Sequence, residues 1–372
     1  MIVWRSGTVT ALGRRWRGAI ELTATLDAAP GRGAVSGAHH PGRDAEQVRA
    51  LAYPELVGAP QEGDRVLLNV TALSLGLGTG GYAHVVALPD RLPPDRASTG
   101  HAVKARYTPL QSVVLAVEEE ASPHRDAIAA NSDVDGMPVV VADLHSALPA
   151  ILTGIHLERP GARVAYLMTD GGALPAWFSR TLDAVADQLV GVVTVGQAFG
   201  GDLEATTTHS GLLAARHVLH ADVAVVSQGP GNLGTGTPWG FSGVAAGEAV
   251  NAAAALGGRP VGSLRISAAD PRPRHRGLSH HTTTAYGRVA LAAAELVLPD
   301  PLEPELAPMV HAALRPLRAR HRVVSTSTEG LLEALRAQPA PLSTMGRGLD
   351  ADTAYFLAAA AAGRHASQLL GG

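Results

Sequence analysis

The feature that most constrains the fold is a regular alternation of short apolar runs and helical segments, which begins at Met137. The apolar runs lack an inside-outside alternation, which is typical of parallel strands covered on both faces. They lie at Pro138–Ala142, Arg163–Met168, Gly191–Val195, Ala221–Val226 and Pro260–Ile266, with weaker ones at Glu295–Leu298 and Arg322–Ser325. Helical periodicity is present at Pro175–Leu189, Leu203–Leu219, Ser242–Leu256 and, in an alanine-rich tail, Asp350–Gly363. The pattern predicts a doubly wound, Rossmann-like α/β domain with a mostly parallel sheet.

The N-terminal region has a different pattern, in which apolar and polar residues alternate between turn signals. The runs Ile2–Leu12, Ala19–Leu26 and Arg65–Ala72 are expected strands, and residues 29–50, rich in Gly, Pro and Arg, are expected to form a mobile loop. The turn-rich residues 89–100 are a candidate linker, and residues 102–120 are expected to add another strand. We therefore expect a small β-barrel-like domain over residues 1–95 and the Rossmann-like α/β domain over residues 96–372.

Composition excludes several classes of protein. Hydrophobic residues make up 46% and charged residues 17% of the 372 residues, enough to build a core. The net charge of -3 argues against nucleic-acid binding, and no uninterrupted apolar run reaches the roughly 18 residues of a membrane span. The charged N-terminus lacks the apolar centre of a signal peptide, so a cytoplasmic location is expected. The absence of cysteine excludes disulfides, thiolate metal sites and a cysteine nucleophile.

Long sequence strings along nearly the whole chain point to a known family. They are TALSLGLGTGGY, KARYTPLQ, VEEEASP, DGMPVVVADLHSALP, YLMTDGGALP, GPGNLGTGTPWGFSG and RHRGLSHHTTTA. In these strings the chain resembles a bacterial family of unknown function, DUF3866. The resemblance implies an N-terminal β region followed by an α/β body. It implies no activity, so function must be argued from the residues.

Polar residues follow the ends of the predicted parallel strands, where ligands bind in open α/β sheets. Asp143 and His145 follow the first strand and Asp170 follows the second. Together with a histidine of the segment 275–281, such as His275, Asp143 and His145 could form a nitrogen and oxygen site for zinc, manganese or iron. Asp170 is a candidate catalytic carboxylate, although a helix entry is its simpler role.

The segment Gly229–Gly243 is a second candidate site, because six of its fifteen residues are glycines between a strand and a helix. Backbone N–H groups in such a loop can hold an anion. The candidate ligand-binding residues are Gly229, Gly231, Asn232, Gly234, Thr235 and Gly236. The match to the dinucleotide pattern is discounted, because the loop continues to Ser242 and no acidic residue ends the next strand. No Walker lysine follows, so neither NAD nor ATP is supported as a cofactor, and a tight structural turn remains an alternative.

Three histidines occur close together at positions 275, 280 and 281. Ser279 is a candidate N-cap, which would place His280 and His281 in the first turn of a helix and favour their neutral form. Neutral His280 is thus a candidate general base or metal ligand. Because adjacent helical residues point in different directions, only one of the pair is expected to share a site with His275. Arg276, with neighbouring arginines, could hold a carboxylate or phosphate, although a solvated arginine stretch is the simpler alternative.

Two further candidates rest on composition and repetition. Lys104 is the single lysine among 30 basic residues, so it could be a site residue where arginine does not serve. The tetrapeptide Leu-Gly-Thr-Gly occurs twice, at residues 77–80 and 233–236. If the second copy binds one end of the ligand, Gly78 and Thr79 of the first copy could bind the other end. Coincidence in a chain with 42 glycines is the alternative.

These features lead to two hypotheses for function. The first is an enzyme that acts on a small anionic metabolite, phosphorylated or not, at the carboxyl edge of the α/β sheet, with or without a divalent metal. The second is a noncatalytic ligand-binding or regulatory protein that uses the same cleft. An acid and base pair with perturbed pKa values would favour the enzyme. The sequence identifies neither the ligand nor the reaction, and it leaves open assembly into a homo-oligomer.

Overall fold

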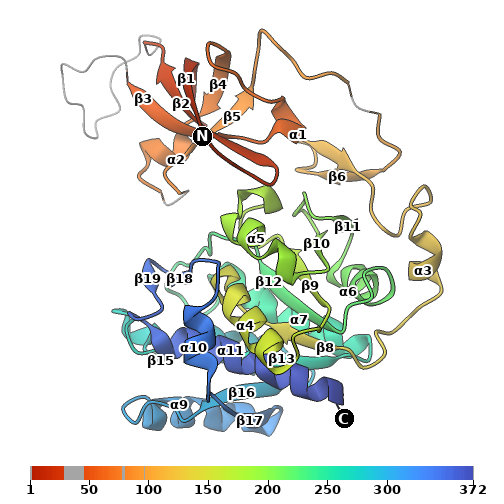
Figure 1. The fold of residues 1–372 in the computed structure, drawn as a ribbon, viewed down its shortest axis with the longest axis vertical. Coiled ribbons are helices and arrows are strands. Elements are labelled where there is room, and N and C mark those ends of the chain that lie inside the picture. Colours follow the sequence, from red (N-terminus) through yellow and green to blue (C-terminus); the bar gives the residue numbers. More distant parts are fainter. Residues whose placement is uncertain (1, 29–45, 78–79, 96, 372) are drawn as a thin grey trace. The chain divides into compact units, whose positions relative to one another are not determined.

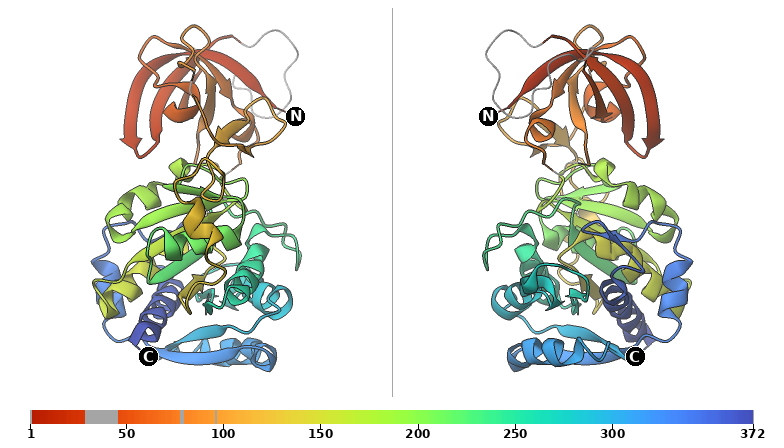
Figure 2. Two further views of the ribbon diagram at one scale, coloured as in Figure 1. Left: turned by 90° about the vertical axis from the view of Figure 1, so that its right-hand side faces the viewer. Right: turned by 90° about the vertical axis from the view of Figure 1, so that its left-hand side faces the viewer.

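The computed structural model describes residues 2–28, 46–77, 80–95 and 97–371. The chain divides into two compact units (Figures 1 and 2). The first consists of residues 1–97 and 105–112, and the second of residues 98–104 and 113–372. No helix within the described ranges is long and apolar enough to cross a membrane.

The first unit contains a closed five-stranded barrel in the order β1-β2-β3-β5-β4, in which only β3 and β5 pair in parallel. The strands are β1 (Trp4–Trp16), β2 (Ala19–Leu26), β3 (Gln47–Ala52), β4 (Arg65–Asn69) and β5 (Ala83–Ala87). Short helices α1 (Pro54–Val57) and α2 (Thr71–Ser74) join them. Alternate residues such as Leu22, Ala24 and Leu68 fill the barrel, as the period of a strand requires.

The barrel confirms the expected β region but corrects its details. The expected loop over residues 29–50 includes the first residues of strand β3 (Gln47–Ala52), and residues 29–45 lie outside the described ranges. The strand β3 was missed because its pairing with β2 and β5 is formed by residues distant in sequence. The expected strand at 65–72 ends at Asn69, whose side chain accepts a hydrogen bond from the N–H of Thr71 where α2 begins.

The second unit is built on an eight-stranded sheet in the order β11-β10-β9-β12-β8-β13-β16-β17. All neighbouring strands in this sheet pair in parallel. The strands are β8 (Pro138–Val141), β9 (Val164–Thr169), β10 (Gly191–Val195), β11 (Leu203–Ala205), β12 (Val223–Gln228), β13 (Arg259–Ser263), β16 (Glu295–Asp300) and β17 (Arg322–Ser327). The predicted mostly parallel α/β sheet is confirmed.

Helices cover both faces of the sheet and form two separate cores, so the sheet is doubly wound (Figure 1). One face carries α4 (Leu148–Glu158), α5 (Arg180–Ala184), α10 (Leu331–Arg336) and α11 (Thr353–Gln368). The other carries α3 (Arg125–Ala129), α6 (Thr208–His217), α7 (Ala245–Ala255) and α9 (Ala307–Leu314). The short helix α8 spans His280–Thr284. Strand residues alternate between the two cores: Val139 and Val141 contribute to one, and Val140 to the other. Apolar residues on both sides explain the uninterrupted apolar runs.

The remaining strands are short and lie mostly in the second unit. They are β6 (Ala102–Lys104), β7 (Ser112–Val114), β14 (Ile266–Ser267), β15 (Gly277–Leu278), β18 (Ser343–Thr344) and β19 (Arg347–Gly348). Single-turn helices lie at His145–Ala147, Ala176–Phe178, Ala186–Gln188, Ser242–Val244, Pro273–His275, Arg315–Ala319 and Leu369–Gly371, and a π-helical turn at Ala285–Val289.

Two of the expected helices differ from those observed. The segment 175–189 is broken into short turns because Ser179 caps α5 (Arg180–Ala184), accepting a hydrogen bond from the N–H of Leu182. The segment 203–219 begins with β11 (Leu203–Ala205), which pairs with β10, and becomes helical only at Thr208. Sheet pairing and capping therefore override the local helical periodicity.

Helices α4 and α11 pack against each other at two glycines. A Cβ on Gly154 would lie 1.8 Å from the carbonyl oxygen of Ala360, and a Cβ on Gly363 would lie 2.0 Å from that of Ile151. The absence of side chains at both positions lets the two backbones touch, although the helices are some 200 residues apart in sequence. The alanines of α11 are almost all buried at this contact and against the sheet.

Candidate functional site

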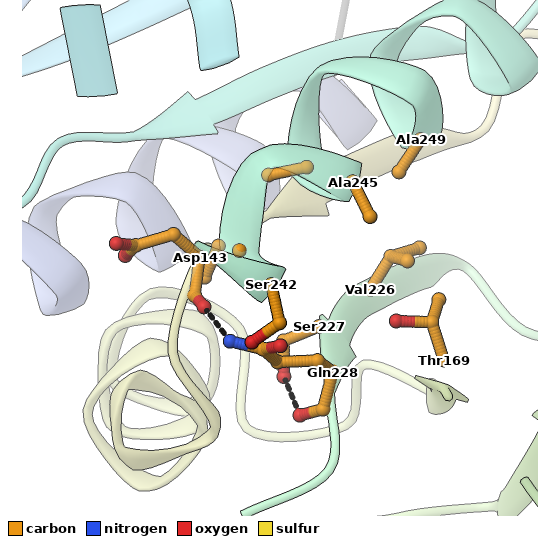
Figure 3. A pocket seen from close by; sticks show the side chains of 11 residues that line it. Asp143, Thr169, Val226, Ser227, Gln228, Ser242, Ala245 and Ala249 are labelled. Carbon is orange, nitrogen blue, oxygen red and sulfur yellow. Dashed lines mark hydrogen bonds between the residues drawn. The ribbon is translucent and has the colours of Figure 1, made fainter. Parts of the chain in front are cut away.

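The winding of the sheet reverses between the neighbouring strands β8 and β12. The chain leaves β8 toward β9 on one side and leaves β12 toward β13 on the other. A crevice opens at the carboxyl ends of strands at such a point, and ligands bind there in open α/β sheets. A cavity of about 10 Å³ lies at this edge, lined by Asp143, Gln228 and Ser242 among others (Figure 3). It is large enough for about one water molecule, so a metabolite must bind outside it.

Figure 3 shows the carboxylate of Asp143 pointing away from the other side chains that line this cavity. The carbonyl oxygen of Asp143 accepts a hydrogen bond of 2.8 Å from Nε2 of Gln228. The carboxylate instead meets Arg265, whose Nη1 donates to Oδ2 at 3.3 Å. Both residues are buried, with relative exposures of 7% and 4%.

A short hairpin after strand β13 and the helix that follows it supply the polar side chains that surround the Asp143 carboxylate. Strands β14 and β15 pair in antiparallel fashion, Ile266 with Leu278 and Ser267 with Gly277. The single-turn helix Pro273–His275 lies within the hairpin, and α8 follows it. Ser279 caps α8 by accepting a hydrogen bond from the N–H of His281, as the sequence predicted. Residues 265–281 therefore bring several polar side chains to one place.

The three histidines of this segment converge. One ligand atom from each of His275, His280 and His281 lies within 4.8 Å of the other two. The ring centroids are separated by 4.5 to 4.9 Å. The expectation that only one of the adjacent pair shares a site with His275 is wrong. Helix α8 is only five residues long, and the ring of His275 lies close to both of its first two side chains.

Each histidine has a different set of partners. Nδ1 of His275 is hydrogen-bonded to the hydroxyl of Ser279 at 2.8 Å. Nδ1 of His281 lies 3.0 Å from Nη1 of Arg265 and 3.4 Å from Oδ2 of Asp143. Nε2 of His280 is buried and has no hydrogen-bond partner among the described residues. A buried polar atom without a partner is costly, so this nitrogen is a candidate for binding a ligand.

Arginines and aspartates form a charge-balanced network beside the histidines. Arg265 faces Asp143 and, at 3.9 Å, Asp270. Asp270 also pairs with Arg272 at 2.8 Å and with Arg347 at 3.2 Å. Arg347 reaches Asp352 at 3.0 Å, and Asp352 accepts a hydrogen bond from Ser267. Three cations and three carboxylates neutralise one another, so the network adds little net charge to the cluster.

The environment keeps His275 and His280 neutral. Burial, together with the charges of Arg265 and Arg272, lowers the pKa of His275 to about 3. Burial and the neighbouring His281 and Arg274 lower the pKa of His280 to about 4. Burial alone would raise the pKa of Asp143, but hydrogen bonding to His281 and the charge of Arg265 hold it below its usual value. At neutral pH the cluster thus presents imidazole lone pairs beside an ionised carboxylate.

The structure places the other predicted metal and catalytic residues elsewhere. Both ring nitrogens of His145 are engaged, Nδ1 with the hydroxyl of Tyr166 at 2.8 Å and Nε2 with that of Ser179 at 2.7 Å. His145 therefore has no lone pair to offer a metal and fastens the sheet to the turn before α5. Asp170 accepts a hydrogen bond of 2.8 Å from the N–H of Gln197 and ties the end of β9 to that of β10.

Lys104 is buried, with 2% exposure, and its ammonium group is fully committed. Nζ donates to the carbonyl oxygens of Gly196 and Ala198, both at 2.8 Å, and lies 3.4 Å from Oε2 of Glu204. Burial raises the pKa of Glu204, and the charge of Lys104 opposes that rise. The single lysine thus has a special position, but its hydrogen bonds fasten the loop between β10 and β11.

The glycine-rich loop leads from β12 to the histidine cluster. Gly229 donates its N–H to Thr169, and the loop closes on itself between Gly234 and Phe241, with Thr235 donating to Gly240. Asn232 accepts hydrogen bonds from Gln228 and Ser242 and so holds the loop to the strand. Residues 233–239 are exposed, and Gly231 and Gly236 have positive φ angles.

Phe241 ends the loop against the histidines, stacked on His281. Arg274 lies against the loop, with its guanidinium 3.5 Å from the point where a Cβ on Gly236 would stand. Arg274 and Arg276 are both exposed. The second predicted glycine-threonine pair, Gly78 and Thr79, lies outside the described residues.

The sequence reasoning missed Arg265 and the pair Arg347 and Asp352. Arg265 had a signal, because it interrupts the apolar run Pro260–Ile266 and a charged residue in a covered strand needs a buried partner. The sequence carries no such signal for Asp352 and Arg347, because only the tertiary fold brings them to Asp270 and Ser267.

The comparison with protein families adds an identification. The model of a family described as a protein of unknown function, DUF3866, matches residues 49–363. The chain belongs to DUF3866. The match spans most of β3 onward through the sheet and the histidine segment, so the candidate site lies within the family's domain. No curated protein and no solved structure matches the chain significantly.

Proposed function

We propose that this DUF3866 protein is an enzyme that acts on a small anionic metabolite, carrying a carboxylate or phosphate, at the carboxyl edge of the α/β sheet. The observation that carries the proposal is the convergence of three histidines, two of them held neutral by their surroundings, beside an ionised aspartate. Ionisable groups with perturbed pKa values gather at catalytic sites, because proton transfer needs a base that is unprotonated, or an acid that still carries its proton, near pH 7. A structural core would be filled at lower cost by apolar side chains.

The anion would be held by the residues that border the cluster. Arg274 is exposed and lies against Gly236, and the glycine-rich loop presents its backbone beside it. A guanidinium next to backbone N–H groups suits a carboxylate or a phosphate. The charge-balanced network of Arg265, Arg272 and Arg347 would keep the histidines in place without competing for the anion.

Binding of the anion is tested with inorganic phosphate and succinate as probes, by calorimetry on protein freed of any bound metal, zinc included, with a chelator. We expect Arg274→Ala to weaken binding by at least tenfold, because a charge-assisted hydrogen bond contributes about 1.5–3 kcal/mol. Arg180→Ala is the matched control, since Arg180 is exposed on α5. Equal binding by Arg274→Ala and wild type would remove the anion site from the proposal.

Turnover is tested by incubating the protein with a pool of metabolite acids and following each compound by mass spectrometry. The proposal requires that at least one anion be consumed by the wild type and at least a hundredfold more slowly by His280→Ala. An anion that binds at the Arg274 site but is never consumed would instead identify a noncatalytic binding protein, the alternative hypothesis.

A further inference from the structure

We propose that His275, His280 and His281 bind one divalent transition-metal ion, zinc being the best match. Three imidazoles are a donor set that zinc, copper, nickel and iron share, and three protein ligands leave a position open for water or substrate. The inference rests on the proposed function for the role of the site, but the presence of the metal is tested without any substrate. Such an ion would bring its bound water close to ionisation at neutral pH.

The first support is the state of the donor atoms. Imidazole binds a metal only through a ring nitrogen that carries no proton, so the partners of the two nitrogens decide which one of each ring can bind. Nδ1 of His275 is engaged by Ser279, which leaves Nε2 of His275 to offer. Nδ1 of His281 lies 3.0 Å from Nη1 of Arg265, which can only donate, and 3.4 Å from Oδ2 of Asp143. His281 therefore offers Nε2 in the tautomer whose Nδ1–H is directed at Asp143, and metal binding requires the Arg265 guanidinium to leave Nδ1. Nε2 of His280 is buried without a partner, which a metal bond would resolve.

The second support is the surroundings of His281. Metal-bound histidines usually donate their other N–H to a carboxylate, which fixes the tautomer and strengthens the ligand. Oδ2 of Asp143 lies 3.4 Å from Nδ1 of His281 and is itself held by Arg265. Asp143, predicted from the sequence as a metal ligand, is therefore assigned the role of positioning His281.

The third support is distance. A tetrahedral zinc ion with Zn–N bonds of about 2.1 Å holds its nitrogens about 3.4 Å apart. The three ligand atoms lie within 4.8 Å of one another, so rotation of the rings by a small amount closes the site. Three of the nearby arginines, Arg265, Arg272 and Arg347, are paired with carboxylates. The charge of Arg274 also acts on His280 and opposes the cation.

The test uses the full chain without a polyhistidine tag, stripped with a chelator and dialysed against Zn²⁺ or Co²⁺. Elemental analysis gives the stoichiometry, and the visible absorption of Co²⁺ reports its coordination. We expect one ion per chain, at least a tenfold loss of affinity in His280→Gln and a loss of about 10–100-fold in Asp143→Asn. His209→Ala, an exposed histidine on α6, is the matched control and should bind as the wild type does.

Two outcomes would overturn the inference. One is a folded wild type that binds no Zn²⁺ or Co²⁺ at micromolar concentration, and the other is undiminished binding by His280→Gln. If His280→Gln fails to fold by circular dichroism, the tetrahedral Co²⁺ spectrum and its loss in Asp143→Asn decide in its place. Because phosphate binding is measured on zinc-free protein, loss of the metal site and loss of the anion site are observed separately.

Discussion

Phe241 stacks face to face on His281, with ring centroids 3.7 Å apart and ring planes inclined by 4°. Phe241 is buried and ends the glycine-rich loop, whereas His281 is the second residue of helix α8. One aromatic contact therefore couples the loop that follows β12 to the histidine cluster that follows β13. Any change in the path of the loop should be felt at the cluster.

Replacing Phe241 by alanine should lower the free energy of unfolding by about 3 kcal/mol, because it leaves a cavity and removes the support of the His281 ring. Denaturant unfolding measures the loss. Trp239→Ala is the control from the same loop: Trp239 is 54% exposed, and its contact with Arg288 is worth about 1 kcal/mol or less. Equal losses from the two substitutions would show that Phe241 has no special role.

Gly236 and Gly234 form a matched pair for testing the loop. The φ angle of Gly236 is +82°, so Gly236→Ala should strain the loop by about 1–2 kcal/mol and weaken phosphate binding by about five- to thirtyfold. A Cβ on Gly234 has no atom nearer than 3.8 Å, so Gly234→Ala should bind phosphate as the wild type does. Calorimetry on both variants checks this, and a larger effect at Gly234 than at Gly236 would contradict it.

Lys104 and Glu204 should show strong coupling. Lys104→Met removes the cation from a buried pair and should lower the free energy of unfolding by about 3–5 kcal/mol, because Glu204 stays behind uncompensated. Adding Glu204→Gln should recover part of that loss. A double-mutant cycle by denaturant unfolding measures the coupling. Additive effects would mean that the two groups do not interact. If Lys104→Met changed the affinity for metal or phosphate, Lys104 would be a residue of the functional site, as the sequence analysis expected.

His145 should make the protein less stable in acid. Burial lowers its pKa to about 4 in the folded chain, against about 6.5 when unfolded, so below pH 6.5 the unfolded chain binds a proton that the folded chain does not. The loss in free energy of unfolding begins near pH 6.5, is complete near pH 4, and reaches about 2 kcal/mol at pH 5. Unfolding at pH 7.5 and 5.0 measures it. His145→Gln should show a smaller pH dependence, and an unchanged one would assign the effect to other groups.

The sheet could be predicted because each strand carries its own evidence. Val139, Val140 and Val141 are all buried, since successive side chains enter opposite cores, and a run of this kind is visible in one sequence. Helix boundaries were less predictable where a single side chain decides them. Ser179 follows a single-turn helix and is the N-cap of α5. Its hydroxyl is also hydrogen-bonded to His145, which lies 34 residues away in the sequence.

The candidate site was predictable in its location but not in its composition. Ser279 as a cap and the three nearby histidines follow from local sequence, and parallel strands bring Asp143 to the same edge. The partners of these residues were not predictable. The side chain of His145 contacts Tyr166 instead of entering the site, and the rings of His280 and His281 lie close together instead of diverging. Both arrangements depend on tertiary packing, which the spacing of residues in the sequence does not reveal.

The contact between α4 and α11 has a consequence for how the chain matures on the ribosome. Helix α11 covers one face of a sheet whose first strand is completed more than 200 residues earlier, and the close backbone contacts of Gly154 with Ala360 and of Gly363 with Ile151 form only when α11 is present. Until residues 353–368 have left the exit tunnel, α4 and the strands beneath it remain exposed to water. The α/β unit must therefore wait for nearly its whole length to be translated, and nascent chains paused before Thr353 should be clients of chaperones.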